Sequence, residues 1–439
     1  YMNVNSYAAG LVTRLHAVLM ALLCVFVAVD ATADKYAYGE DFARVGHSWA
    51  DAGPPLAAAV LNSDPGVDQS DSFRQQLAAL EDSEGPYSDA LAEPLTSLGR
   101  YYRASGDLEQ ATSMYRRALH LVRINDGLYS ERQMPVLREL LAVYRVTGDL
   151  GALDQRYEYY FRLYGNGQPP YTEVRLRAAL GYLRWQREAL RLGLDGDSMR
   201  RLQHLYRLNE DLLQATATDP SVSLAHYRDV VLSQVRNLYL LEDRVRPRLE
   251  EIGRVSGAPQ FAQQFDQQDF DQRRLESVQR GALSRGSELL EELIGRYDPG
   301  ADPQQVARLY LELGDWYQWH NSESRAARHY TQAAELLTAS GDQALLQEWF
   351  GQPVELPDNG AFWQPPVQVN DQPPLVLKVA YDVSASGRAS NLKSIDEDPA
   401  YDGKANRLKR ALRQIRFRPR WVNGAAQSAS VRRDYQLFD

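Results

Sequence analysis

The stretch Leu-Gly-Arg-Tyr-Tyr-Arg-Ala-Ser-Gly-Asp-Leu-Glu-Gln-Ala-Thr-Ser-Met-Tyr-Arg-Arg-Ala, residues 98–118, decides the fold. Six of its positions recur with the same spacing in residues 313–333: Leu98, Gly99, Tyr102, Ala111, Tyr115 and Ala118 return as Leu313, Gly314, Tyr317, Ala326, Tyr330 and Ala333. Small residues let two antiparallel helices approach closely, while leucines and tyrosines fill the space between them. Gly106-Asp107 supplies the turn. Both segments are therefore predicted to be helical hairpins.

A second period, of 42 residues, runs through residues 87–172. It relates Tyr87-Ser88 to Tyr129-Ser130 and Tyr171-Thr172, and Gly106-Asp107 to Gly148-Asp149. The second copy has Leu141 in place of Gly99 and Tyr160 in place of Ala118, so we expect it to pack less closely. The third copy lacks the turn glycine.

These positions resemble the tetratricopeptide repeat, in which Leu-Gly-x-x-Tyr, Ala and aromatic positions fall in this order. The longer period resembles the kinesin-light-chain type of repeat. Residues 200–298 keep the apolar spacing of helices without clear repeat marks. Because repeat hairpins bury their apolar faces only against stacked neighbours, the resemblance implies a continuous stack. We predict a mainly α fold with an α-solenoid of tetratricopeptide-type hairpins over residues 85–345.

The first 33 residues have the pattern of a secretory signal peptide. Arg14 precedes an apolar run at 17–29, and Ala31-Thr32-Ala33 is a small-residue cleavage site. A retained anchor is one alternative, although 13 apolar residues rise only about 20 Å as a helix, against ~30 Å of hydrocarbon core. A lipoprotein is the other, through Cys24, the single cysteine. Cleavage predicts a periplasmic mature chain without cysteine or a stable membrane span, and excludes nucleic acid as a partner.

Two segments of mixed composition flank the helical region. Residues 34–84 combine short helical patches with Gly, Pro, Ser and Asp, which predicts a weakly structured lead-in. Residues 346–373 are predicted to be a proline-rich, semi-rigid connector, since six prolines fall within 353–374. The net charge is −9, yet residues 374–439 carry 13 Lys and Arg against 7 Asp and Glu. An acidic body thus bears a basic C-terminal domain, residues 374–439.

The period changes from helical to alternating after Pro374. Residues 375–383 and 391–395 are expected to be strands, and Leu408, Leu412 and Ile415 form the apolar stripe of a helix that Pro419 ends. Asn423-Gly424 marks a turn. A last strand follows, in which alternate residues share one face: Val431, Arg433, Tyr435 and Leu437. The predicted order is β-β-α-β, a small α+β domain.

This domain resembles the TonB C-terminal domain. The resemblance rests on the strand Val379-Ala380-Tyr381-Asp382-Val383, on Gly387-Arg388, on the helix ending Ile415-Arg416-Phe417-Arg418-Pro419, and on Asn423-Gly424. It implies contact with outer-membrane transporters, whose extended segment adds to a sheet edge. The last strand, with Val431, Arg433, Tyr435 and Leu437, or the strand beside it, is the expected strand-addition edge. The family's transmembrane anchor and long spacer are replaced here by a signal peptide and helices, so energy transduction by this chain alone is not expected.

Two arginine sets are candidate binding residues. The first helices of tetratricopeptide hairpins line the concave groove, and the matching positions here are Arg100, Arg103, Arg138 and Arg145. They would clamp an acidic segment or a C-terminal carboxylate, unless they are only solvated cations. The basic rim of the C-terminal helix comprises Arg407, Arg410, Arg413 and Arg416. This rim could bind an anionic partner.

Catalytic chemistry has no recognisable signature. The seven histidines lack metal-ligand spacing, and no phosphate-binding glycine loop or nucleophile elbow is present. We therefore expect no catalytic residue, cofactor or metal. The leading hypothesis is a non-enzymatic periplasmic scaffold, in a Gram-negative bacterium, that assists TonB/ExbB/ExbD-dependent outer-membrane transport. One alternative is a scaffold for cell-envelope or peptidoglycan assembly, and the other is an enzyme with an unrecognised site in residues 200–298.

Overall fold

The structure is a computed structural model that describes residues 42–45, 69–194, 198–255, 275–362, 375–395 and 402–437. The chain divides into two units, Tyr1–Ala37 and Tyr38–Asp439, and every described residue belongs to the second. The predicted signal peptide, most of the lead-in and residues 363–373 of the predicted connector lie outside the described residues.

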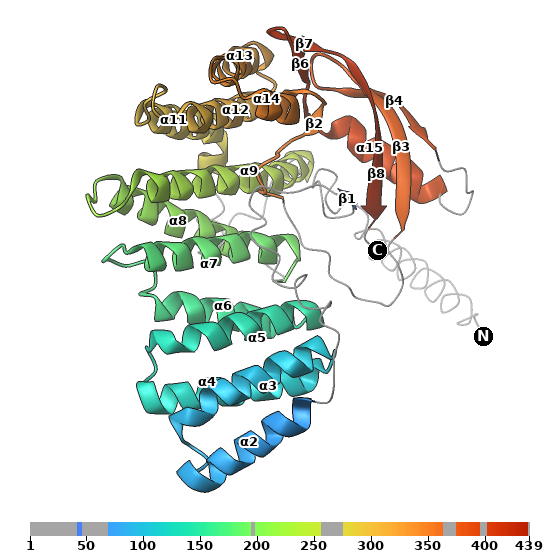
Figure 1. The fold of residues 1–439 in the computed structure, drawn as a ribbon. Helices are drawn as coiled ribbons and strands as arrows, with labels where there is room; N and C mark the ends of the chain where they lie inside the picture. The colour runs from blue at the N-terminus through green and yellow to red at the C-terminus, as the bar shows by residue number, and fades with distance from the viewer. Residues whose placement is uncertain are drawn as a thin grey trace, which may run out of the picture. The chain divides into compact units, whose positions relative to one another are not determined.

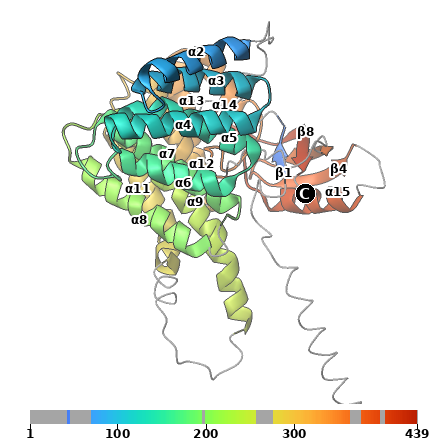
Figure 2. The same ribbon diagram turned by 90° about the horizontal axis from the view of Figure 1, so that it is seen from below.

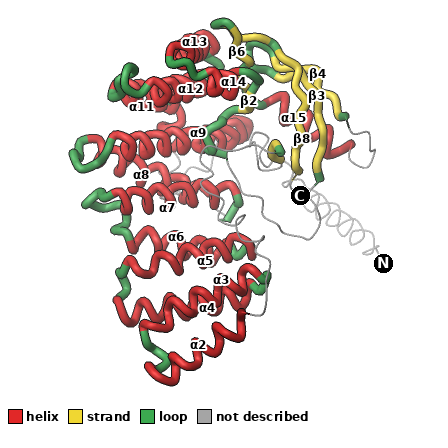
Figure 3. The backbone as a smooth tube through the Cα atoms, viewed as in Figure 1, coloured by secondary structure: helices red, strands yellow, loops and turns green. Residues whose placement is uncertain are grey.

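Helices make up most of the described chain, as predicted (Figure 3). Their bounds are α2 Gln69–Glu84, α3 Ala92–Ala104, α4 Leu108–Asp126, α5 Met134–Thr147, α6 Leu150–Leu163, α7 Glu173–Arg191, α8 Ser198–Ala217, α9 Leu224–Val255, α11 Ala282–Gly295, α12 Pro303–Trp319, α13 Glu323–Ala339 and α14 Gln343–Phe350. From α2 to α9 each helix packs on the next, and α11 continues the series from α9 to α12, α13 and α14. The succession can be followed in Figure 1 and from below in Figure 2.

The two hairpins predicted from the recurring pattern are α3–α4 and α12–α13. A Cβ added to Gly99 would lie 2.6 Å from the ring of Tyr115, and one added to Gly314 would lie 2.5 Å from the ring of Tyr330. The alanines of the pattern, including Ala118, are buried. The missing side chain of each glycine therefore lets a tyrosine of the second helix lie against the backbone of the first.

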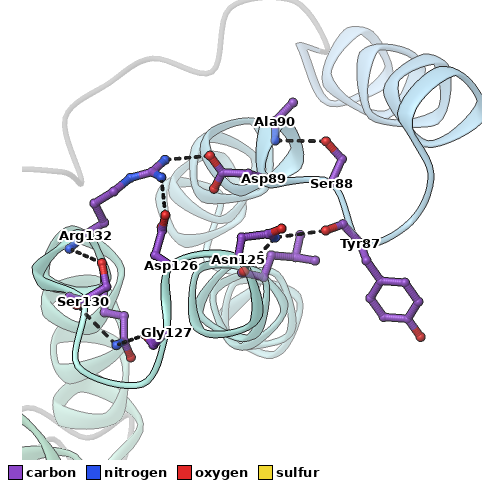
Figure 4. A network of polar contacts seen from close by, with 11 residues as sticks. Tyr87, Ser88, Asp89, Ala90, Asn125, Asp126, Gly127, Ser130 and Arg132 are labelled. Carbon is purple, nitrogen blue, oxygen red and sulfur yellow. Dashed lines mark hydrogen bonds and ion pairs between the residues drawn. The ribbon is translucent and has the colours of Figure 1, made fainter.

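The 42-residue period organises the loops between hairpins. Asn125 Nδ2 donates to the carbonyl of Tyr87 at 2.9 Å, while Arg132 bonds Asp126 at 2.7 Å and Asp89 at 2.9 Å (Figure 4). The hydroxyls of Ser88 and Ser130, one period apart, each accept an N–H of the turn that follows. The Arg132–Asp126 contact joins the end of α4 to the start of α5, and the contacts of Asn125 and Arg132 with Tyr87 and Asp89 join the same loop to the residues just before α3.

Residues 69–84 of the predicted lead-in form the regular helix α2, where only weak or partial helix was expected. Arg74 Nη2 donates to the hydroxyl of Tyr102 at 2.7 Å, and one period later Arg116 Nε donates to the hydroxyl of Tyr144 at 2.9 Å. Helix α2 therefore corresponds to α4, the second helix of a hairpin. The helical stack begins one helix earlier than predicted. Phe73, Leu77 and Leu80 pack against the core and explain why this segment is helical.

The C-terminal region forms three small antiparallel sheets. The strands are β1 Phe42–Arg44, β2 Val354–Glu355, β3 Val376–Val383, β4 Ala389–Ser394, β5 Phe417–Arg418, β6 Arg420–Val422, β7 Ala425–Gln427 and β8 Ala429–Leu437. The largest sheet has the order β1-β8-β3-β4, and the others pair β2 with β5 and β6 with β7. Helix α15, Asp402–Gln414, packs on β4 and buries Leu408 and Leu412. The predicted strands and helix are present, but β1, β2, β5, β6 and β7 were not predicted.

The predicted proline-rich connector is wrong for residues 346–362. Residues 346–350 belong to α14, and β2 pairs with β5. Leu356 and Phe362 are fully buried. Arg236 Nε on α9 donates to the carbonyl of Asn359 at 2.7 Å. Proline content favoured an extended spacer, whereas the apolar side chains between the prolines pack against the helices.

Adding a methyl group at the two hairpin glycines tests this packing. Gly99→Ala and Gly314→Ala should each lower the free energy of unfolding by about 1–3 kcal/mol, because the tyrosine ring must move away. Urea unfolding followed by circular dichroism measures the loss. Gly181→Ala in α7 is the matched control, since an added Cβ there meets nothing within 4 Å, and it should be neutral or stabilising by up to about 1 kcal/mol. Equal effects at all three sites would contradict the prediction.

Candidate functional site

The predicted groove arginines lie on first helices of hairpins, but carboxylates of the same chain already bind most of them. Arg100 Nε on α3 lies 2.9 Å from Glu139 Oε1 on α5, and Arg103 Nη1 lies 2.7 Å from Glu139 Oε2. The hydrogen bond to Glu139 raises the pKa of Arg100. Arg138 is exposed and interacts with Tyr160.

Arg145, the fourth groove arginine, is held most firmly. It donates to both carboxylate oxygens of Glu188 on α7, with Nη2 3.0 Å from Oε2. Burial disfavours its charge, but Glu188 raises the pKa of Arg145 above its ordinary value. The predicted open clamp for an incoming carboxylate is therefore corrected: Arg100, Arg103 and Arg145 are engaged in ion pairs that tie neighbouring helices together.

The predicted strand-addition edge is strand β8, and part of it is already occupied. Strand β1 pairs with the last three residues of β8 in antiparallel register, with Phe42 opposite Leu437. Val45 N–H extends the pairing by donating to the carbonyl of Asp434 at 2.8 Å. The predicted open edge is thus wrong at Tyr435 and Leu437, because residues of the predicted lead-in cover it. Within the described residues, Ala429–Arg433 has no strand partner on that side.

Helix α15 carries the one predicted cationic set that points to solvent. Arg407, Arg410 and Arg413 are exposed, and within the described part of the chain none forms an ion pair or hydrogen bond. Their spacing of three residues places them along one side of the helix, away from the buried Leu408 and Leu412. Arg416 follows the end of α15 and is half-buried, so it does not belong to this exposed set. We call Arg407, Arg410 and Arg413 the cationic face.

A buried ion pair joins the C-terminal domain to the helices. Arg418 on β5 donates from Nε to Asp315 Oδ1 at 2.9 Å and from Nη2 to Asp315 Oδ2 at 2.8 Å. Its Nη1 donates to the carbonyl of Trp349 at 2.9 Å, and Nη2 also bonds Asp358 at 3.1 Å. The Arg418 side chain is 2% exposed. Burial opposes its charge, yet the two aspartates raise the pKa of Arg418.

The same junction has a neutral contact. Gln318 Nε2 on α12 donates to the carbonyl of Ser386 at 2.9 Å and to that of Phe417 at 3.2 Å. A Cβ on Gly387 would lie 2.1 Å from the carbonyl oxygen of Phe417, so only glycine fits this approach. The helices, the β3–β4 turn and β5 are therefore packed as one junction.

A buried polar network occupies the described part of residues 200–298, where a hidden enzyme site was an alternative. Arg187 Nη1 donates to Ser233 Oγ at 2.9 Å and to Asn237 Oδ1 at 3.0 Å. Asn237 Nδ2 donates to Asn209 Oδ1 at 3.1 Å, and Asn209 Nδ2 to the carbonyl of Val230 at 3.1 Å. These groups bond one another across α7, α8 and α9, which is the arrangement of a structural network.

No protein-family model matches the chain, and no curated protein sequence matches it. Among the described residues, no helix is both long and apolar enough to cross a membrane. The same residues contain no cluster of three or more His, Cys, Asp or Glu side chains that could hold a metal ion.

Sequence reasoning missed the Arg418–Asp315 pair and strand β1. Arg418 was noted only as part of the Ile415–Pro419 motif, and Asp315 follows the repeat glycine Gly314 without any motif of its own. A buried ion pair between residues so distant in sequence has no local signal. Strand β1 has only three residues, too few for an alternating pattern.

Replacing Arg418 tests the junction. Arg418→Met leaves Asp315 buried without its cation, and should lower the free energy of unfolding by about 3–5 kcal/mol. Arg413→Met on the exposed side of α15 is the control and should change it by no more than about 0.5 kcal/mol. Urea unfolding measures both. A loss for Arg418→Met no larger than that for Arg413→Met would contradict the role assigned to the pair.

Proposed function

We propose that this protein is a non-enzymatic interaction scaffold in the periplasm of a Gram-negative bacterium, in which a tetratricopeptide-type α-solenoid carries a TonB C-terminal-like domain. Its partner is a component of the TonB/ExbB/ExbD system or an outer-membrane receptor. The protein acts as an accessory of TonB-dependent outer-membrane transport.

The helical part supports a scaffold. Consecutive helices pack in order along the chain, and Gly99 and Gly314 let tyrosines approach the backbone as the tetratricopeptide pattern requires. Such stacks offer extended surfaces to protein partners. The ion pairs of Arg103 and Arg145 stiffen this stack and leave those arginines engaged.

The C-terminal domain supports a partner-binding role at that end. Its elements β3, β4, α15 and β8 follow the β-β-α-β series on which the TonB resemblance rests, with β5, β6 and β7 between α15 and β8. The observation that carries the proposal is the cationic face. Arg407, Arg410 and Arg413 are exposed, so a partner can bind their side chains. The buried Arg418, in contrast, holds the domain against the helices.

Recovery of partners from envelope extracts tests this function. The immobilised full chain should retain a TonB-system component or an outer-membrane receptor, and Arg407→Ala/Arg410→Ala/Arg413→Ala should retain much less. Three exposed contacts of up to about 1 kcal/mol each correspond to as much as about 100-fold in affinity. Quantitative mass spectrometry of the retained proteins gives the ratio.

The control variant removes the same charge elsewhere. Arg200, Arg207 and Arg280 are also exposed, and all three lie in the helical part. The triple alanine variant at these positions should retain partners as the unaltered chain does. Recovery of neither a TonB-system component nor an outer-membrane receptor by the unaltered chain would count against the proposed function.

A second candidate function is a scaffold for cell-envelope or peptidoglycan assembly, and the cationic face favours it as well. Cell-wall polymer carries carboxylates that exposed arginines bind. In this case the full chain should sediment with purified sacculi, and the cationic-face triple variant should bind them more weakly, by as much as about 100-fold. Binding should also weaken as salt rises, because exposed charges are screened. Sedimentation that is absent, or equal in both chains, would exclude this second function.

A further inference from the structure

Two adjoining loops of the helical stack present large apolar side chains to solvent. Residues 85–91 join α2 to α3, and residues 127–133 join α4 to α5. Tyr129 is 79% exposed, Tyr87 66% and Leu128 62%, which makes them the three most exposed large apolar side chains among the described residues. We call these three residues the tyrosine patch. Single exposed apolar side chains are ordinary, but a group of them is typical of a surface that a partner covers.

Hydrogen bonds hold the backbone from which the tyrosine patch projects. The carbonyl of Leu128 accepts from Gln133 Nε2 at 2.9 Å and from the hydroxyl of Tyr159 at 3.1 Å. The carbonyl of Tyr87 accepts from Asn125 Nδ2 at 2.9 Å, and the ring of Tyr87 points away from this contact (Figure 4). Because these loops are already ordered, a partner that binds them loses little free energy in ordering them.

Acidic side chains accompany the tyrosine patch. Residues 82–91 and 126–133 together hold five Asp and Glu against one basic residue, Arg132. Arg132 is bound to Asp89 and Asp126. The three remaining acids are all at least half-exposed, with carboxylates that no Lys or Arg of the described chain pairs: Asp82, Glu84 and Glu131. Charge complementarity therefore favours a partner segment that carries Lys or Arg beside its apolar residues.

The same acids disfavour other occupants of the tyrosine patch. A second copy of this chain that docked through the same loops would place acidic residues against acidic residues, which is unfavourable. An anionic lipid surface attracts basic segments and repels an acidic one. A cationic protein segment is thus the occupant that the charges select.

We propose that the tyrosine patch, with Asp82, Glu84 and Glu131, binds a segment of a partner protein in which large apolar residues are flanked by Lys or Arg. The cationic face on α15 has the opposite charge, so the two surfaces select different partners. The inference goes beyond the proposed function, because it gives the helical part a partner of its own. The chain then joins a cationic segment on its helices to an anionic partner on its C-terminal domain.

Peptides of defined composition test the proposal. The probe is a labelled peptide of about 14 residues, long enough as a helix to cross two packed helices, with leucine on one side and lysine on the other. Fluorescence anisotropy measures its binding to the full chain. Two otherwise identical peptides, one with glutamate for lysine and one with serine for leucine, should bind at least about tenfold more weakly. Failure of the full chain to bind the leucine–lysine peptide would overturn the proposal.

Removing the apolar side chains should weaken binding of this peptide. Tyr87→Ser/Leu128→Ser/Tyr129→Ser should lower the affinity by at least about tenfold, and should leave the urea midpoint of unfolding unchanged because the three side chains are exposed. Val146→Ser/Val376→Ser/Ile395→Ser is the matched control, since it removes exposed apolar side chains elsewhere. The control should bind within about twofold of the parent chain. An equal loss in both variants would contradict the site.

Removing the charges separates the acids of this site from the acidity of the whole chain. Asp82→Asn/Glu84→Gln/Glu131→Gln should lower the affinity by at least about threefold, and the remaining binding should depend less on salt. Glu288→Gln/Glu335→Gln/Glu348→Gln removes the same charge from exposed positions on α11, α13 and α14. It should bind the peptide as the parent chain does, and a loss equal to that of the first variant would sink the assigned role of the three acids.

Other occupants give different results. With the photoreactive p-benzoylphenylalanine in place of Tyr129, irradiation should attach the leucine–lysine peptide; attachment only to another segment of the same chain would overturn the proposal. So would a dimer, seen by sedimentation velocity, that the serine variant of the tyrosine patch dissociates. Binding to phosphatidylglycerol–phosphatidylcholine vesicles that the same variant abolishes would overturn it as well. The peptide is a defined probe, so its result stands apart from what envelope extracts yield.

Discussion

The buried pair of Arg418 and Asp315 is the interaction on which the arrangement of the C-terminal domain depends. A guanidinium that is 2% exposed is tolerated only with its partners fixed, and here they come from α12, the end of α14 and residue Asp358. Tyr330 links this pair to the repeat, because its hydroxyl donates to Asp315 at 2.9 Å while its ring lies against Gly314. The packing of the α12–α13 hairpin and the attachment of the C-terminal domain therefore both depend on Tyr330.

The features predicted from the sequence were those set by local spacing. Gly99, Tyr115 and Ala118 fall on helix faces at intervals that one hairpin dictates, so the α3–α4 contact was visible in residues 98–118. The alternation of Leu377, Val379 and Tyr381 likewise predicted β3 and its buried side. In each case the residues that determine the structure lie within one or two elements of one another.

The features that were not predicted join residues far apart in the chain. Arg418 pairs with Asp315, and Phe42 packs on Tyr435, although neither partner has a sequence pattern that names the other. Composition was misleading for residues 346–362, because prolines favour an extended spacer and the buried Leu356 and Phe362 outweigh that preference. The groove arginines were placed on the correct helices, but Glu139 and Glu188 could be recognised as their partners only in three dimensions.

The use of arginine divides the molecule into parts with different roles. In the helices, Arg103 and Arg145 form ion pairs with carboxylates of neighbouring helices. These ion pairs stabilise the stack and leave the two arginines engaged. On α15 the arginines lie on the opposite side from the apolar stripe, where no neighbouring helix in the described chain brings a carboxylate. The net charge of −9 is compatible with a cationic surface because the charge is unevenly distributed, with 13 Lys and Arg against 7 Asp and Glu in residues 374–439. The exposed arginines to which we assign partner binding lie on the C-terminal domain.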